Sequence, residues 1–296
     1  MSAHKKRKLA RADENSSDSS EQQGSDSSQS DSEDSSNSSD SKSEKGSDVA
    51  VDLEFFDPKE SDFQGLKSLL HLFLDGQEYD SSLLATVGSV IKTGEDGDPL
   101  GLVTVLNTQR YSGLQHMQQI LSFLKLNAPT PTDATRVQQV WQSTGTGLML
   151  TERLANTPPQ LAPPLIQSLC EEIHWALEDE PTQAARDAYN FNAYLVVSRV
   201  YEDEDEAGMG SSKATGKQPK KPPAGPKKVV YARPEDEYFH KQAEWSYIFP
   251  VANRATEKDE LRQLRIVMCL KPAKLKLARK ELDKVVGNPV AALAAA

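Results

Sequence analysis

The chain has 296 residues, with 34 Lys and Arg against 44 Asp and Glu, which gives a formal net charge of −10. This balance argues against direct nucleic-acid binding, which needs an excess of basic residues, and favours basic partners. No apolar run approaches the roughly 18 residues of a membrane-spanning helix, and the N-terminus lacks the apolar segment of a secretory signal. We therefore expect an intracellular protein with no membrane contact.

The first 48 residues have the composition of a disordered tail. Residues 15–48 contain sixteen Ser and nine Asp or Glu and lack Ile, Leu, Val, Phe, Trp, Tyr and Met, so folding would bury almost no apolar surface. A basic cluster precedes this acidic tract, and such clusters are typical of nuclear-import signals, although a solvated charge run has the same pattern. The cluster consists of Lys5, Lys6, Arg7, Lys8 and Arg11.

Residues 49–288 are expected to form a single α/β domain. Within it, residues 202–228 run from acidic EDEDE to GKQPKKPPAGPKK, which indicates a disordered loop between two strand-like segments. The last residues, 289–296, are expected to be a disordered end.

In chain order, a strand is predicted over 51–56. A helix follows to about Asp75, with Asp57 as N-cap, Pro58 at the first helical position and Glu60 at N3. Residues 87–93 and 100–107 are rich in β-formers and flank a GEDGDP turn, which predicts a hairpin.

In the second half of the domain, segments with helical periodicity alternate with strand-like segments. A helix is predicted over 114–125, a loop over 127–135, and a strong helix after NTPPQLAPP, since apolar residues recur there at helical spacing. Strands are expected at 189–201, 228–233, 243–249 and 264–270, with PEDEYFHK forming a short helix between the second and third of them. A last helix, basic on one face, is predicted over 272–286. The fold class is a mixed β-sheet flanked by helices.

One motif suggests an enzyme. QSTGTG at 142–147 spells Q-x-x-G-x-G, the kind of loop that wraps a coenzyme A pyrophosphate in acetyltransferases. That chemistry requires a strand before the loop and a helix after it, for which 136–141 and 148–155 are the candidates. A plain turn explains the same six residues.

Metal and nucleophile sites have weaker support. Cys170 and His174 stand four residues apart on one predicted helix, yet no second pair has zinc-site spacing, so helix packing is the preferred interpretation. No metal, cofactor or catalytic residue is assigned.

Several long segments make the chain resemble the BCCIP family over about 51–286. They are FFDPKESDFQGLKSLL at 55–70, VGSVIKT at 87–93, LANTPPQLAPPL at 154–165, HWALEDEPT at 174–182, YARPEDEYFH at 231–240 and WSYIFP at 245–250. The resemblance implies a nuclear protein that binds other proteins, linked to cell cycle, DNA repair and ribosome assembly. Fungal relatives look like chaperones and export factors for a basic ribosomal protein. The resemblance also implies a fold similar to that of acetyltransferases, without acetyltransferase activity.

The leading hypothesis is a non-enzymatic chaperone or assembly factor whose acidic residues shield a basic, ribosomal client. An acetyltransferase-like enzyme and an adaptor for cell-cycle and repair proteins are the alternatives. The predicted acidic contacts are Glu178, Asp179, Glu180, Glu235, Asp236 and Glu237. Trp175 and Trp245 are candidate aromatic anchors, with core packing as the alternative for both.

Overall fold

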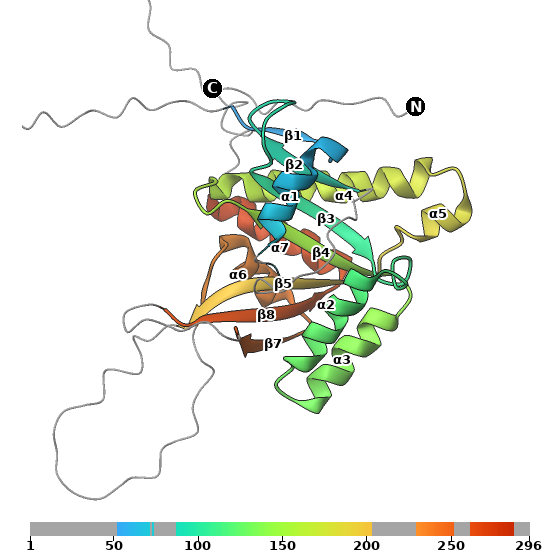
Figure 1. Cartoon of the computed structure of the whole chain (residues 1–296), viewed down its shortest axis with the longest axis vertical. Helices are drawn as coiled ribbons and strands as arrows, with labels where there is room; N and C mark the ends of the chain where they lie inside the picture. The colour runs from blue at the N-terminus through green and yellow to red at the C-terminus, as the bar shows by residue number, and fades with distance from the viewer. Residues whose placement is uncertain (1–51, 72, 74–86, 203–228, 252–260, 287–296) are drawn as a thin grey trace, which may run out of the picture.

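The computed structural model describes residues 52–71, 73, 87–202, 229–251 and 261–286, which share one mixed β-sheet (Figure 1). Its strands lie in the order β1-β2-β3-β4-β5-β8-β7, with β6 also paired to β5. The β4–β5 pair is parallel and the other pairs are antiparallel. The strands are β1 (Glu54–Phe56), β2 (Gly88–Lys92), β3 (Gly101–Asn107), β4 (Thr146–Arg153), β5 (Ala193–Glu202), β6 (Val229–Tyr231), β7 (Trp245–Pro250) and β8 (Gln263–Leu270).

Helices cover both faces of the sheet (Figure 1). One face packs against α4 (Ala162–Asp179), α6 (Pro234–Gln242) and α7 (Pro272–Val286). The other packs against α1 (Phe63–Leu70), α2 (Gln115–Leu126) and α3 (Pro131–Gln142). Short helical segments complete the fold: η1 (Glu60–Asp62), η2 (Pro159–Leu161) and α5 (Gln183–Asp187). None of these described helices is long and apolar enough to cross a membrane.

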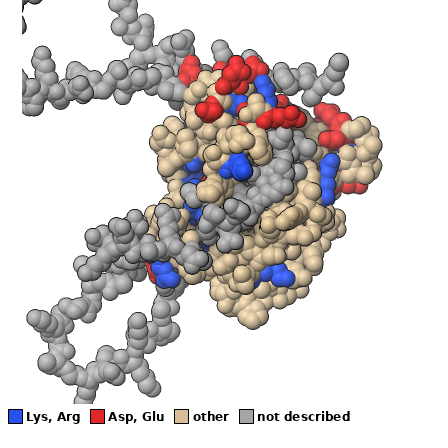
Figure 2. Space-filling view, viewed as in Figure 1, with Lys and Arg blue, Asp and Glu red and all other residues tan. Residues whose placement is uncertain are grey.

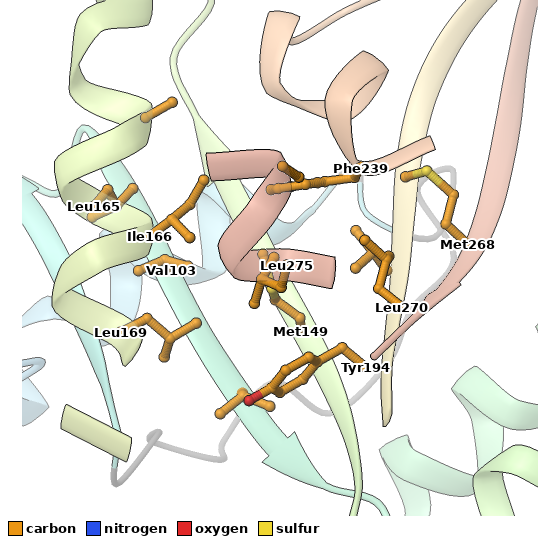
Figure 3. Packing of buried hydrophobic residues seen from close by; sticks show 14 of the residues in the cluster. Val103, Met149, Leu165, Ile166, Leu169, Tyr194, Phe239, Met268, Leu270 and Leu275 are labelled. Atoms are coloured by element: carbon orange, nitrogen blue, oxygen red, sulfur yellow. The ribbon is translucent and has the colours of Figure 1, made fainter. Parts of the chain in front are cut away.

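The core follows from the alternation of side chains along the central strands. On β4, Met149 points into the layer beneath α4 and α7, whereas Leu148 and Leu150 point toward α2 and α3. The first layer contains Leu165, Leu275 and their neighbours (Figure 3). Because both faces of the inner strands are buried, these strands are apolar almost throughout.

Most predicted elements are confirmed: the 87–107 hairpin, the helices at 114–125, 234–241 and 272–286, the helix after the Pro-rich segment, and the four later strands. The predicted loop over 127–135 is wrong from residue 131 onward, because α3 begins there. Thr130 is its N-cap and accepts a hydrogen bond from the Asp133 backbone N–H at 3.1 Å. Pro131 fits the first helical position, where its missing N–H is not needed.

The helix predicted from Asp57 to Asp75 is shorter in the structure. η1 begins at Glu60, and α1 ends at Leu70. Asp57 is therefore not the N-cap. The predicted tail (1–48), the C-terminal end (289–296) and the predicted loop beyond Glu202 lie outside the described residues.

Candidate protein-binding site

The C-terminal end of α4 presents three of the predicted contact residues together. Trp175 is 39% exposed, and Glu178 and Asp179 follow it by three and four residues, so all three share one side of the helix. Glu178 lies 3.4 Å from the His174 Nε2 atom, with both side chains exposed. Glu180 is half-buried at the C-cap. This helix end combines an aromatic surface with carboxylates in solvent.

The predicted contacts on α6 require a correction. Glu235 and Asp236 are 1% and 0% exposed. Glu235 makes a bidentate ion pair with Arg153, and Asp236 accepts hydrogen bonds from Ser198 and Arg233. Burying a carboxylate is tolerable only with such partners, so these two side chains serve the interior and are not exposed docking residues. The Glu237 side chain is about half exposed (47%) and pairs with Lys241 at 2.8 Å.

Trp245 starts β7, an edge strand of the sheet. It is half-buried and stacks on Tyr247, with ring centroids 6.2 Å apart and planes 2° apart. Tyr247 donates a hydrogen bond to the Leu124 carbonyl of α2 at 2.9 Å. Trp245 thus contributes to packing around α2, in contrast to the more exposed Trp175.

Exposed carboxylates also gather where β1, η1 and the β2–β3 turn meet, a surface that we call the acidic corner. In Figure 2 acidic atoms crowd this end of the molecule, at the top of the view. The corner draws on three short segments of the chain. Its residues are Asp52, Asp57, Glu60, Glu95, Asp96 and Asp98, all of them exposed.

Two basic side chains near the acidic corner, Lys59 and Lys92, are paired with carboxylates. Lys92 is 1% exposed and forms a buried ion pair with Asp62. Lys59 bonds to Glu95 at 2.8 Å, and this hydrogen bond raises the pKa of Lys59. The remaining carboxylates of the corner face solvent, where they attract cations.

The acidic corner is joined to α4 through Glu172. Its carboxylate accepts hydrogen bonds from the Gly88 N–H and the Ser89 hydroxyl, both at 2.6 Å. Burial raises the pKa of Glu172, and the nearby Asp57 adds to this rise. These bonds hold α4 against β2 and therefore fix the corner relative to the helix that presents Trp175.

Sequence reasoning missed this corner. The GEDGDP segment indicated a turn, and only the structure shows that its acids meet those at 52–60. Antiparallel pairing of β1 with β2 opposes Glu54 to Lys92 and so brings the two acidic segments together. The sequence does place acidic residues next to both strands. They could have predicted a shared acidic surface only if the pairing of the two strands had been known.

The glycine motif at 142–147 has the opposite context to the one that coenzyme A binding requires. Helix α3 precedes it and strand β4 follows, whereas coenzyme A binding would need a strand at 136–141 and a helix at 148–155. Gly145 has φ +74°, and a Cβ there would lie 2.6 Å from the Asn190 carbonyl oxygen. A Cβ on Gly147 would lie 2.4 Å from a Val105 methyl group. Both glycines are therefore explained by turn geometry and close packing.

Cys170 and His174 do not form a site. His174 is exposed, while Cys170 is half-buried and has a pKa raised by burial, which disfavours the reactive thiolate. Among the residues that the structure describes, no group of three or more His, Cys, Asp or Glu side chains is placed to hold a metal ion.

Comparison with known proteins identifies the relatives of this chain. A sequence model of the BCCIP family matches residues 48–239. The chain belongs to the BCCIP family. It is 32% identical to the BCCIP homolog protein of Arabidopsis thaliana over 81% of this chain and 75% of that protein. It is 36% identical to protein bcp1 of Emericella nidulans over 66% of this chain and 70% of that protein.

A solved structure is also similar in fold. The crystal structure of BCP1 from Saccharomyces cerevisiae superposes with a TM-score of 0.53, at 22% sequence identity, over 79% of this chain and 88% of that one. This supports the α/β architecture for a BCCIP family member.

Proposed function

We propose that this BCCIP family protein is a non-enzymatic, protein-binding factor of the nucleus, acting as a chaperone or export and assembly factor for a basic ribosomal protein. The supporting observation is the acidic corner, where three segments of the chain supply six exposed carboxylates, of which Glu95 is paired with Lys59. An unassembled ribosomal protein exposes Lys and Arg that are meant for RNA, and a carboxylate surface masks them by charge complementarity. Roles in cell cycle, DNA repair and nuclear transport belong to the same proposal.

The exposed end of α4 supplies a second element of the proposed interface. Trp175 offers an aromatic surface next to Glu178 and Asp179, and interfaces combine such anchors with charged rims. An adaptor for cell-cycle and repair proteins would use the same surface and differ only in its client.

The test measures binding of a purified basic ribosomal protein by fluorescence anisotropy with the full chain. Two double charge reversals, Glu60→Lys with Asp96→Lys and Glu178→Lys with Asp179→Lys, each weaken binding at least tenfold. The matched control, Glu244→Lys with Asp283→Lys, makes the same charge change on other exposed or half-buried carboxylates and leaves affinity within about threefold.

Salt provides the complementary measurement. Binding through exposed carboxylates weakens steeply as the ionic strength rises, because the Debye length falls from about 10 Å at 0.1 M to about 3 Å at 1 M. Affinity that is insensitive to salt and to both reversals would contradict the electrostatic mechanism.

A further inference from the structure

Helix α7 carries a row of lysines that faces away from the core. Lys276, Lys280 and Lys284 are all exposed and follow one another at four-residue steps. At that spacing they share one side of the helix and lie within about 12 Å along its axis. The buried residues of α7 lie on the opposite side, against the sheet. We call these three lysines the basic stripe.

The basic stripe has no counter-charge within the described part of the chain. No hydrogen bond or ion pair to another described residue engages any of its three side chains. The same helix does neutralise its other partly exposed cation, because Arg279 pairs with Asp283 at 2.9 Å. The stripe is therefore an unpartnered, positively charged helix face.

The chain itself contains a segment of complementary charge. Residues 15–48 hold nine Asp or Glu against two Lys. Three of these acids, Asp31, Glu33 and Asp34, fall within a stretch that spans about 10 Å when extended, close to the length of the stripe. Nucleic acid fits less well, because three lysines on a chain of net charge −10 are a small phosphate-binding surface.

The acidic tract is tethered within reach of the stripe. The described fold begins at Asp52, and about 18 flexible residues between it and the acids at 31–34 would span roughly 24 Å on average. From there β1 pairs with β2, α4 packs on β2 and α7 packs on α4 (Figure 1). Each of these steps is about 5–10 Å. Such a tether gives an effective concentration on the order of millimolar, which favours contacts made of individually weak, exposed ion pairs.

We propose that the basic stripe of α7 is the docking surface for this chain's own acidic tract, with the acids at 31–34 placed on the three lysines. Docking there holds the tract back from other basic surfaces until a more strongly cationic protein displaces it. The stripe has the opposite charge to the acidic corner and lies on a different element. The inference does not rest on the proposed function.

Paramagnetic NMR on the isotope-labelled full chain tests this contact. A nitroxide is attached to Ala273→Cys, an exposed position one turn before the stripe. Burial raises the pKa of Cys170 and Cys269, so the reagent prefers the introduced thiol, and wild type treated in the same way gives the background. Docking attenuates the amide signals of residues 26–40 at least twofold more than a nitroxide on Ser143→Cys does. Ser143 is exposed at the end of α3, on the other face of the sheet.

Two sets of charge-removing changes identify the surface. Replacing all three lysines of the stripe by Gln reduces the attenuation to the level of the Ser143 label. The matched control removes three positive charges from the other face of the sheet and retains the attenuation. It consists of Lys67→Gln, Lys125→Gln and Arg136→Gln, on α1, α2 and α3. Circular dichroism checks the fold of each variant.

Three results would overturn the proposal. One is equal attenuation from the two label positions, or in the stripe and control variants. Another is attenuation of the same size in a mixture of isotope-labelled chains without nitroxide and unlabelled chains with it, which would place the tract on a second copy. The third is no attenuation at all, and stripe-dependent binding of an RNA oligonucleotide would then assign the lysines to phosphate. Under the proposal, 1 M salt abolishes the attenuation, because the Debye length falls to about 3 Å.

Discussion

Arg153 on β4 and Glu235 on α6 form a bidentate ion pair that is almost completely buried, with the Nη2–Oε2 distance at 2.8 Å. The pair ties the first turn of a helix to a strand 82 residues earlier in the chain. Next to this pair, Asp236 accepts hydrogen bonds from Ser198 and Arg233. Glu235 and Asp236, both predicted to be surface contacts, therefore stabilise the interior.

Breaking the Arg153–Glu235 pair on one side leaves the other charge buried. We expect Arg153→Met or Glu235→Leu alone to lower the free energy of unfolding by about 3–5 kcal/mol. The double variant loses much less stability than the sum of the two single losses, because no unpaired charge remains buried. Urea denaturation of the four proteins gives this coupling energy. The exposed pair of Glu237 and Lys241 is the control, with less than about 1 kcal/mol for either change to Ala. Additive losses at 153 and 235 would contradict a buried pair.

Gly145 is required by its backbone geometry. Gly145→Ala places a Cβ at φ +74° and 2.6 Å from a carbonyl oxygen, and we expect a loss of about 1–3 kcal/mol. Gly94→Ala is the matched control, because a Cβ there has no atom within 4 Å, and it changes stability by about 0.5 kcal/mol or less. Thermal unfolding followed by circular dichroism measures both. Equal effects of the two changes would remove the structural explanation for the glycine motif.

We expect Trp245 to contribute mainly to stability and Trp175 mainly to binding. Trp245→Ala removes the ring stacked on Tyr247 and lowers the unfolding free energy by about 2 kcal/mol, less than the 3–5 kcal/mol of a fully buried aromatic residue. Trp175→Ala costs less stability because Trp175 is 39% exposed, yet it weakens binding of the proposed basic client. Paired urea and anisotropy measurements test this. If Trp175→Ala destabilised the fold more than Trp245→Ala did, the assignment of Trp175 as an anchor would fail.

His240 makes stability depend on pH. Burial lowers the pKa of His240, whose ring lies 2.6 Å from the Tyr231 hydroxyl and 2.8 Å from the Ser246 hydroxyl. The unfolded chain therefore takes up the proton more readily. The stabilisation by neutral His240 is therefore fully present above the pKa of about 6.5 in the unfolded chain. It is lost as the pH falls toward the lower pKa of His240 in the folded protein.

Urea midpoints at pH 7.5 and 5.5 measure this dependence. The decrease on acidification is larger for the wild type than for His240→Gln, in which the titrating group is absent. The exposed His174 provides the control variant, His174→Gln, which retains the wild-type decrease. The same decrease in all three proteins would show that His240 does not contribute.

The sequence predicted the elements whose periodicity is unambiguous. The apolar residues of α4 recur at helical spacing, and Gly94, Gly97 and Pro99 mark the hairpin between β2 and β3. The coenzyme A alternative required a strand at 136–141 and a helix at 148–155, and the structure has a helix and then a strand there. Val137, Val140 and Trp141 resemble strand formers, but they are spaced for the inner side of α3, where Val137 and Trp141 are buried. β4 is almost wholly buried and so lacks the alternation that distinguishes a strand from a helix.

The site was predictable only in part. Glu178 and Asp179 are exposed, as a polar helix end suggests. Glu235 and Asp236 have the same local character, and their burial depends on Arg153 and Arg233, which reach them through tertiary contacts. Charge patterns alone do not distinguish a solvated carboxylate from one that is paired inside the fold.

The edge strands β1 and β7 of the described sheet also bear on self-association. β1 has only three residues, and β7 ends at Pro250, which has no backbone N–H to offer a neighbouring chain. Short or proline-terminated edges are poor templates for intermolecular β-pairing. A chaperone of the kind proposed above would thereby present little that nucleates fibrils of its own.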